Sequence, residues 1–245
     1  MSAILRIDVD RAYENRILHY ARVNQELFPA LDSFNYLKPC KEMIKDLNSR
    51  GIKASLFFQP FTVPNKDFAQ ELLKEGHSIG LHAVHTKDFK NFLGDLSKIS
   101  RRFDGKVYGF TKHGSGKSKL SRRHISNYNP ERYIKYAKRS NLRYFLGNKE
   151  NPEEREKIVE GVLYFPSAFW VNRNYREDKF IVDWLVDECV SRDVVVLVHP
   201  MDVMGGRELL VREYERMLDR VEFRTIDDIM EGYINAQGND DSNIL

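Results

Sequence analysis

The sequence predicts an α/β fold in a single domain, arranged as an incomplete or distorted (β/α) barrel. Short apolar runs alternate with amphipathic runs along the 245 residues, in seven or eight β-α units. Most of the apolar runs are continuous, which is typical of parallel strands that are covered on both faces. A doubly wound open sheet also fits this pattern. In both architectures the reactive groups gather at the carboxyl ends of the strands.

Eight short runs rich in β-branched and aromatic residues are the expected strands. In chain order they cover residues 4–9, 53–58, 77–82, 106–111, 142–147, 161–167, 194–199 and 221–225. Amphipathic segments between and after them are the expected helices, since their apolar residues recur at helical spacing. These helices cover residues 35–51, 66–76, 89–103, 129–140, 151–161, 177–192, 206–220 and 225–237.

Residues at the ends of several expected helices support these boundaries. Gly51 and Gly76 follow two of the helices, where a glycine can adopt the left-handed backbone that ends a helix. Asn129 and Asn151 each precede a proline, as an N-cap followed by proline at the first helical position does. We therefore expect helices to begin at both asparagines.

Composition argues against a membrane-spanning protein and against a secreted protein held together by disulfides. Hydrophobic residues make up 42% and charged residues 31% of the chain, as in soluble globular proteins, and no apolar run approaches the ~18–20 residues of a membrane span. No secretory signal is expected, because the chain begins directly with a strand pattern. Cys40 and Cys189 predict buried free thiols in a reducing compartment, and hence a cytoplasmic protein. We expect one domain over residues 1–236 and a disordered tail at 237–245.

Positive charge is unevenly distributed along the chain. The net charge is only +3, which is too small to predict a nucleic-acid partner. Many lysines and arginines nevertheless lie between Lys98 and Arg123. This run forms either a solvated surface or a basic rim that attracts an anionic substrate, such as a phosphate-linked one.

Two carboxylates lie at the end of the first expected strand. Asp8 and Asp10 are two residues apart, so on a strand both side chains face the same way. Such a pair can divide its work, with one carboxylate binding a metal ion and the other accepting a proton. The alternative is a strand end with two solvated acids.

Histidines mark two further strand ends. His77, His82 and His85 lie within nine residues, and this clustering predicts at least one metal ligand. His199 ends a strongly apolar run just before Pro200, a position that suits a general acid. A histidine buried in the core, or bonded to a loop carbonyl, is the alternative at each place.

The segment GFTKHGSGKSKL, at residues 109–120, contains a sequence similar to part of a phosphate-binding loop. A Walker-type loop requires a glycine five positions before its Gly-Lys pair, and Thr111 stands there. The residues that follow are too polar for the apolar helix of such a loop. We therefore expect a loop at the barrel rim, with Lys112 and His113 facing the substrate, and a nucleotide site is the weaker alternative.

Taken in order, these motifs resemble those of the polysaccharide deacetylase family, carbohydrate esterase family 4, which includes chitooligosaccharide and peptidoglycan deacetylases. The motifs are Asp-x-Asp on the first strand, the histidine-rich third strand, the polar loop after the fourth and Leu-x-His on the seventh. The resemblance extends from Ile4 to about Ile234. It implies a distorted seven-stranded (β/α) barrel and a hydrolase that removes an N-acetyl group from an amino sugar or glycan.

The resemblance also implies roles for individual residues. Asp8 matches the catalytic base of the family and Asp10 its metal-binding aspartate. His82 matches the first metal-binding histidine, and His199 matches the general acid of the Leu-x-His motif. The implied cofactor is a divalent metal ion, with Zn²⁺ the expected one.

The chain departs from the family pattern in three places. The family places its second metal histidine four residues after the first, where this chain has Thr86, so the expected ligand is His85, one residue early. A site with two ligands is the alternative. Lys112 stands where the family has an arginine, and is expected to orient Asp8 in its place. The fourth motif has no match, and Trp170 is the candidate wall of the substrate pocket.

Two other functions fit the same residues. One is hydrolysis of a C–N bond outside sugars, such as that of a cyclic amide, by the same metal site. The other is a catalytically impaired relative that binds glycans without a metal ion, which the displaced His85 favours.

Overall fold

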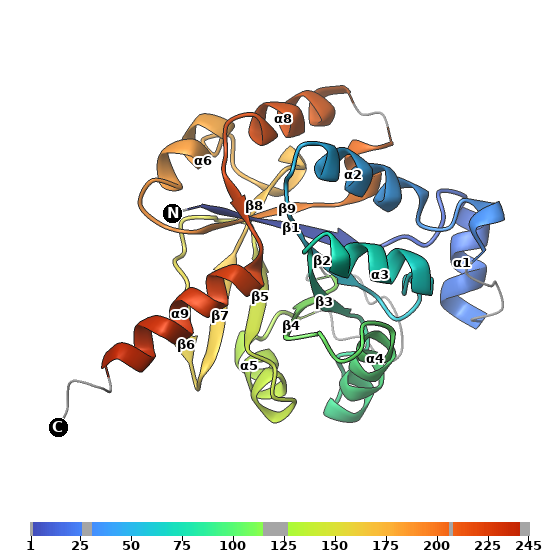
Figure 1. The fold of residues 1–245 in the computed structure, drawn as a ribbon, viewed down its shortest axis with the longest axis horizontal. Helices are drawn as coiled ribbons and strands as arrows, with labels where there is room; N and C mark the ends of the chain where they lie inside the picture. Colours follow the sequence, from blue (N-terminus) through green and yellow to red (C-terminus); the bar gives the residue numbers. More distant parts are fainter. Residues whose placement is uncertain (1, 26–30, 115–126, 206–207, 241–245) are drawn as a thin grey trace.

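Seven parallel strands curl into a barrel in the computed structural model, which describes residues 2–25, 31–114, 127–205 and 208–240 (Figure 1). Their order around the barrel is β7-β5-β4-β3-β2-β1-β9. The strands are β1 (Ala3–Val9), β2 (Ser55–Phe58), β3 (Ser78–Ala83), β4 (Gly109–Lys112), β5 (Tyr144–Lys149), β7 (Val162–Ser167) and β9 (Val194–Val198). All seven coincide with expected strands to within three residues at each end.

Three short strands complete the sheet. β6 (Lys157–Val159) pairs antiparallel with β7, β8 (Phe169–Trp170) pairs with β9, and β10 (Phe223–Arg224) pairs with β1. β7 and β8 belong to one extended segment, which pairs with β5 at its beginning and with β9 at its end. This segment therefore bridges the two edges of the curled sheet, and the distorted (β/α) barrel is confirmed over the doubly wound sheet.

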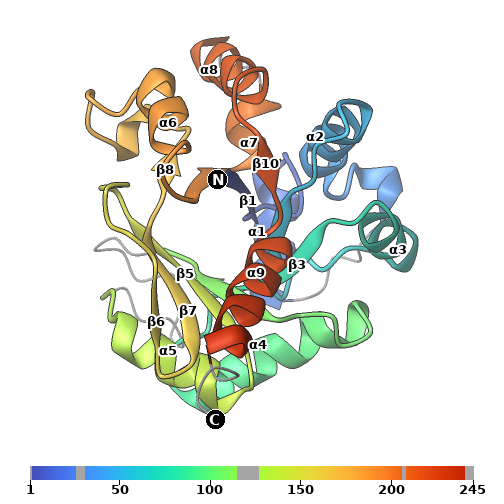
Figure 2. The same ribbon diagram turned by 60° about the vertical axis from the view of Figure 1, so that its left-hand side comes forward.

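Helices surround the barrel on its outside, as Figures 1 and 2 show. Seven of the eight expected helices are present, and α1 and the short α7 were not expected. The helices are α1 (Arg16–Gln25), α2 (Lys38–Ser49), α3 (Lys66–Lys74), α4 (Phe89–Arg102), α5 (Pro130–Arg139), α6 (Val182–Glu188), α7 (Pro200–Val203), α8 (Glu208–Leu218) and α9 (Ile226–Asp240).

Local sequence signals account for several helix ends. The side chain of Asn129 accepts a hydrogen bond from the backbone N–H of Arg132, and Pro130 begins α5, as expected. Gly51 and Gly76 have φ values of 69° and 80°, so each adopts the left-handed backbone predicted after its helix.

The helix expected at residues 151–161 is wrong, because this segment forms a turn and then the β6–β7 hairpin. Two residues with positive φ, Glu160 at 53° and Gly161 at 80°, connect the two strands. Positive φ at both central residues is the geometry of a type I′ turn, which matches the twist of paired strands. Asn151 therefore caps a turn, through the N–H of Glu153, and not a helix.

Burial on both faces explains the continuous apolar strands. On β1, Leu5 and Ile7 face the helices, whereas Ile4 packs inside the barrel with Phe57 of β2. The first turns of α9, which follow β10, add their own apolar side chains to this interior cluster. The amino-terminal end of the barrel is thereby filled, and the open end is the carboxyl end of the strands.

The C-terminal helix is longer than expected. α9 continues to Asp240 and thus includes part of the 237–245 segment that was expected to be disordered. Residues 241–245 lie outside the described part. Cys40 and Cys189 are buried free thiols, as expected.

Among the described helices, none combines the length and the low polarity that a membrane span requires.

Candidate metal centre and catalytic pocket

The inner face of β1 carries three charged side chains toward the open end of the barrel. Arg6, Asp8 and Asp10 occupy alternate positions, so they share the face that Ile4 begins. Arg6 and Asp8 are almost completely buried, with exposed fractions of 0% and 2%. Burial of this kind requires that each charge be paired.

Arg6 and Asp8 form a bidentate ion pair inside the barrel. Nε of Arg6 donates to Oδ1 of Asp8 at 3.0 Å, and Nη2 donates to Oδ2 at 2.6 Å. Two further N–H groups of Arg6, on Nη1 and Nη2, donate to the backbone oxygen of Gly147 and to Oδ1 of Asn148, both at 2.7 Å. Burial raises the pKa of Asp8, but the Arg6 charge and nearby histidines outweigh it, so the pKa lies below its ordinary value.

Arg6 therefore occupies the place beside Asp8 that was expected for Lys112. Nζ of Lys112 donates to the backbone oxygens of His113 and Gly114, and burial lowers the pKa of Lys112 to about 8. A signal for Arg6 was present in the sequence, because it precedes Asp8 by two residues, the same spacing that relates Asp8 to Asp10.

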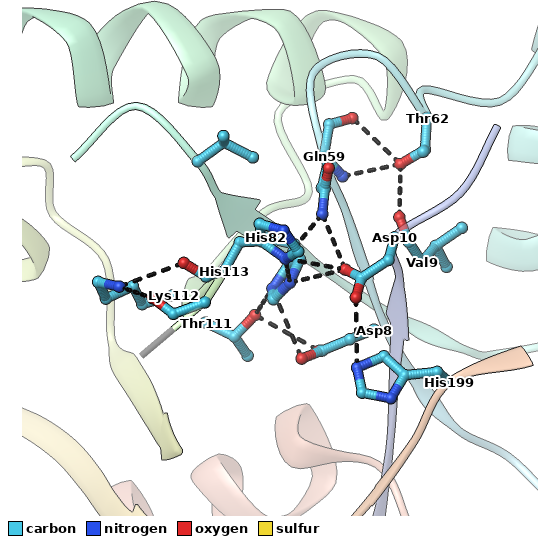
Figure 3. A network of polar contacts seen from close by, with 12 residues as sticks. Asp8, Val9, Asp10, Gln59, Thr62, His82, Thr111, Lys112, His113 and His199 are labelled. Atoms are coloured by element: carbon cyan, nitrogen blue, oxygen red, sulfur yellow. Dashed lines mark hydrogen bonds and ion pairs between the residues drawn. The ribbon is translucent and has the colours of Figure 1, made fainter. Parts of the chain in front are cut away.

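Asp10, His82 and His113 form a compact cluster of donor atoms at the ends of β1, β3 and β4 (Figure 3). Nε2 of His82 lies 2.9 Å from Oδ1 of Asp10 and 2.9 Å from Nδ1 of His113. Nδ1 of His113 lies 3.1 Å from the same Asp10 oxygen. One carboxylate and two imidazoles are a donor set that suits zinc and similar ions.

His113, expected to contact substrate, takes the place in this cluster that was expected for His85. Nδ1 of His85 lies 2.7 Å from Oδ1 of Asp95 on α4, and its backbone N–H also donates to Asp95. β4 is the neighbour of β3, with Thr111 opposite His82, so His113 reaches the donor cluster from the adjacent strand end. The second imidazole of the cluster, expected from His85 after the third strand, thus comes from His113 after the fourth.

His77 lies away from the cluster. It precedes β3, at the amino end of the strand, and its ring contacts the backbone N–H of Ala54 and the side chain of Asn48. Burial lowers its pKa to about 4, so it is a neutral structural histidine. Of the three clustered histidines, only His82 joins the donor cluster.

Two of the cluster residues, His82 and Asp10, hold the protonation states that metal binding requires. Burial lowers the pKa of His82, and Thr111 Oγ1 lies 2.5 Å from its Nδ1. With Nδ1–H donated to Thr111, Nε2 keeps its lone pair for an ion. Burial raises the pKa of Asp10, but His113 and the other nearby imidazoles hold it well below its ordinary value. Asp10 is therefore a carboxylate.

His199 lies at the end of β9, facing Asp10 from another side. Its Nε2 is 3.4 Å from Oδ2 of Asp10, and its Nδ1 is 3.5 Å from Oδ2 of Asp202. Burial lowers the pKa of His199, but the carboxylates of Asp10, Asp202 and Asp8 outweigh burial and raise the pKa to about 9. His199 is thus an imidazolium at neutral pH and can donate a proton.

We expect His199 to make the stability of the metal-free protein depend on pH. Its folded pKa of about 9 lies above the ordinary value of 6.5, so its contribution is complete below pH 6.5 and is lost as the pH rises through 9. The loss amounts to about 3 kcal/mol. Urea unfolding of the wild type and of His199→Gln between pH 6 and pH 10 measures it.

Lys112 titrates in the same pH range as His199 and changes the free energy of unfolding in the opposite direction. Lys112 is present in both proteins, so the difference between the two pH profiles isolates the effect of His199. The pKa of Lys112 is lowered, so its effect on stability becomes less unfavourable as the pH rises. Parallel profiles for wild type and His199→Gln would contradict the assignment.

The cluster opens into a cavity of about 830 Å³ that also contains Asp8, His199 and Trp170. The ring of Trp170 lies 5.9 Å from that of His199 and 4.9 Å from that of Tyr175, measured between centroids. Trp170 thus stands on the cavity wall, where it was expected. The cavity also includes Gly114, but residues 115–126, with the Gly-Lys pair of the GSGKS segment, lie outside the described part.

No protein-family model matches the chain, and no curated protein sequence matches it. Among solved structures, a probable polysaccharide deacetylase from Pseudomonas aeruginosa PAO1 aligns over 94% of this chain and 89% of its own, with a TM-score of 0.59 and 13% identity. The chain has the polysaccharide deacetylase fold. A CE4 family pseudoenzyme from Bacillus anthracis aligns over 94% of this chain and 65% of its own, with a TM-score of 0.50 and 12% identity.

The polysaccharide deacetylase fold confirms the architecture that the sequence motifs implied. One of these two neighbours is described as a probable deacetylase and the other as a pseudoenzyme, so the fold is compatible with both. Function therefore has to be argued from the side chains in the cavity.

Proposed function

We propose that this protein is a metal-dependent hydrolase that removes an N-acetyl group from an amino sugar or a glycan. The observation that carries the proposal is the Asp10–His82–His113 cluster, whose donor atoms lie within 4.8 Å of one another. A carboxylate base and a protonated histidine, Asp8 and His199, line the same cavity. This combination supplies what amide hydrolysis needs.

Asp10, His82 and His113 would hold the divalent ion, with Zn²⁺ the expected one. Their two nitrogen donors and one carboxylate oxygen fit such an ion and leave coordination positions open. When bound, the ion acts as a Lewis acid that polarises the amide carbonyl and lowers the pKa of a water molecule.

Asp8 and His199 would move the protons of the reaction. Asp8 accepts a proton from the water that adds to the carbonyl carbon, and Arg6 keeps its carboxylate ionised and fixed. His199 donates a proton to the amine nitrogen as the C–N bond breaks, which leaves the amino sugar and acetate. Asp202, next to Nδ1 of His199, stabilises the imidazolium before transfer.

The cavity favours an anionic sugar, such as a phosphate-linked one. Arg11 and Arg16 line it and are exposed, and no ion pair of either is found among the described residues. Guanidinium groups bind phosphate and carboxylate oxygens in bidentate fashion. Trp170 offers a flat apolar surface on the same cavity for a sugar ring.

Acetate release from a panel of substrates tests the proposal. The panel contains N-acetylated sugars with and without a phosphate, and small cyclic amides, with protein purified without chelator. We expect release from the sugars, faster from the phosphorylated ones, and its loss after treatment with a chelator. Release from the cyclic amides alone would support the hydrolase of non-sugar C–N bonds instead.

Two histidine variants test the metal site itself. We expect His113→Ala to weaken Zn²⁺ binding by more than about 10-fold, because it removes a donor atom. His85→Ala is the matched control and should bind Zn²⁺ like the wild type, because His85 contacts Asp95 instead. Competition with a chromogenic chelator measures both affinities. A wild type that neither binds a divalent ion nor releases acetate would contradict the proposed function.

A further inference from the structure

Gln59 lies directly beside the donor cluster, in the same row of the barrel. β1 and β2 pair Asp8 with Phe57, and β2 and β3 pair Phe57 with Gly80. Two residues further along each strand, the same register places Gln59 between Asp10 and His82. Because alternate residues share a face, Gln59 points to the interior like both of these neighbours. The fold thus places a polar amide between two of the residues that would hold the ion.

The side chain of Gln59 contacts two of the three cluster residues. Its Nε2 lies 2.8 Å from Oδ1 of Asp10 and 2.9 Å from Nδ1 of His113 (Figure 3). Gln59 is completely buried, and its backbone N–H donates to Thr62 Oγ1, which in turn donates to the backbone oxygen of Val9. Its position next to the cluster is therefore fixed by the ends of β1 and β2.

The other atom of the amide, Oε1 of Gln59, is buried and has no hydrogen-bond partner among the described residues. An unpaired buried amide oxygen costs about 1–3 kcal/mol. Rotation of the amide by 180° exchanges the oxygen and the nitrogen without moving the rest of the side chain. The oxygen can therefore reach the position next to Asp10 and His113.

A bound cation makes this rotation favourable. The lone pairs of Asp10 Oδ1 and His113 Nδ1 would then point to the ion and would no longer accept from the Gln59 amide. An –NH₂ group facing a divalent cation is repelled, whereas an amide oxygen is attracted and is an ordinary ligand of hard cations.

We propose that Gln59 is a fourth protein ligand of the divalent ion and binds it through Oε1, next to Asp10, His82 and His113. This inference rests on the metal site of the proposed function. Gln59 adds a neutral oxygen to the two nitrogens and the carboxylate. With four protein donors, the ion takes a fifth ligand when water or substrate also binds, and zinc can expand from four to five ligands in this way.

Two substitutions at one position distinguish a ligand from a hydrogen-bond donor. Gln59→Leu removes both amide atoms and should weaken Zn²⁺ binding by about 10–100-fold. Gln59→Glu keeps an oxygen in place but removes the N–H donor, and should bind at least as tightly as the wild type. Gln70→Leu makes the same change on the exposed side of α3 and should have no effect. Chelator competition gives the affinities, and circular dichroism confirms that each variant is folded.

Equal weakening in Gln59→Leu and Gln59→Glu would overturn the inference, because Gln59 would then act only as a donor to Asp10. Wild-type affinity in both variants would overturn it as well, while leaving the proposed metal site intact. If the wild type had no affinity for Zn²⁺, the metal site of the proposed function would be contradicted, and the inference about Gln59 with it. A crystal structure of the unsubstituted chain with Zn²⁺ needs no variant, and should show Oε1 of Gln59 within about 2.2 Å of the ion.

Discussion

Replacing Asp8 by asparagine is expected to reduce the turnover of an acetylated sugar by about 10²–10⁴-fold. Asparagine keeps the shape of the side chain and can still accept a hydrogen bond from Arg6, but it cannot take up a proton at neutral pH. Zn²⁺ affinity should change little, because Asp10, His82 and His113 are untouched. Initial rates of acetate release at saturating Zn²⁺ measure the loss.

Two comparisons make this result specific to Asp8. Asp67→Asn, on the exposed first turn of α3, removes a carboxylate that does not line the cavity and should retain wild-type turnover. A matching fall in turnover and in Zn²⁺ affinity of Asp8→Asn would place Asp8 among the metal ligands. Unchanged turnover would exclude it as the base.

Replacing Arg6 by methionine is expected to destabilise the protein by about 3–5 kcal/mol, the second large effect. The carboxylate of Asp8 would remain buried with no guanidinium beside it, and the backbone oxygen of Gly147 and Oδ1 of Asn148 would lose their donor. Urea unfolding at constant m-value measures the change. Arg6→Lys should recover only part of the loss, because one ammonium group cannot reproduce the bidentate pair.

A double-substitution cycle separates the ion pair from general disruption of the core. Arg6→Met combined with Asp8→Leu removes both charges, so we expect it to be more stable than Arg6→Met alone. The double variant should nevertheless release no acetate, because the base is gone. Additive losses of stability would show that the two side chains do not depend on each other.

The strand ends that carry the chemistry could be predicted because their signals are local. Continuous apolar runs mark strands that are buried on both faces, and Asp8, Asp10, His82 and His199 all lie where such a run ends. The prediction of a helix at residues 151–161 was wrong, because the charged residues of this segment also suit a hairpin that is exposed at the edge of the barrel. Its turn depends on positive φ at Glu160, which composition does not reveal.

Residues supplied by neighbouring strands could not be predicted in the same way. His113 was expected to contact substrate, and it lies in the cluster because β4 pairs with β3 in a register that sets Thr111 opposite His82. Gln59 was not considered, because a lone glutamine after an apolar run has no chemical signature. Its position beside the cluster follows from the parallel register of β1, β2 and β3.

The sequence alone determines the order of most strands and helices and places Asp8, Asp10 and His199 at strand ends. Each of these features depends on residues a few positions apart. The partner of Asp8 and the third donor of the cluster depend on the closed barrel. Curling the sheet turns one face of every strand inward, which buries Arg6 against Asp8 and brings strand ends from distant parts of the chain around one point. Spacing along the sequence carries no information about that convergence, because strand pairing in space creates it.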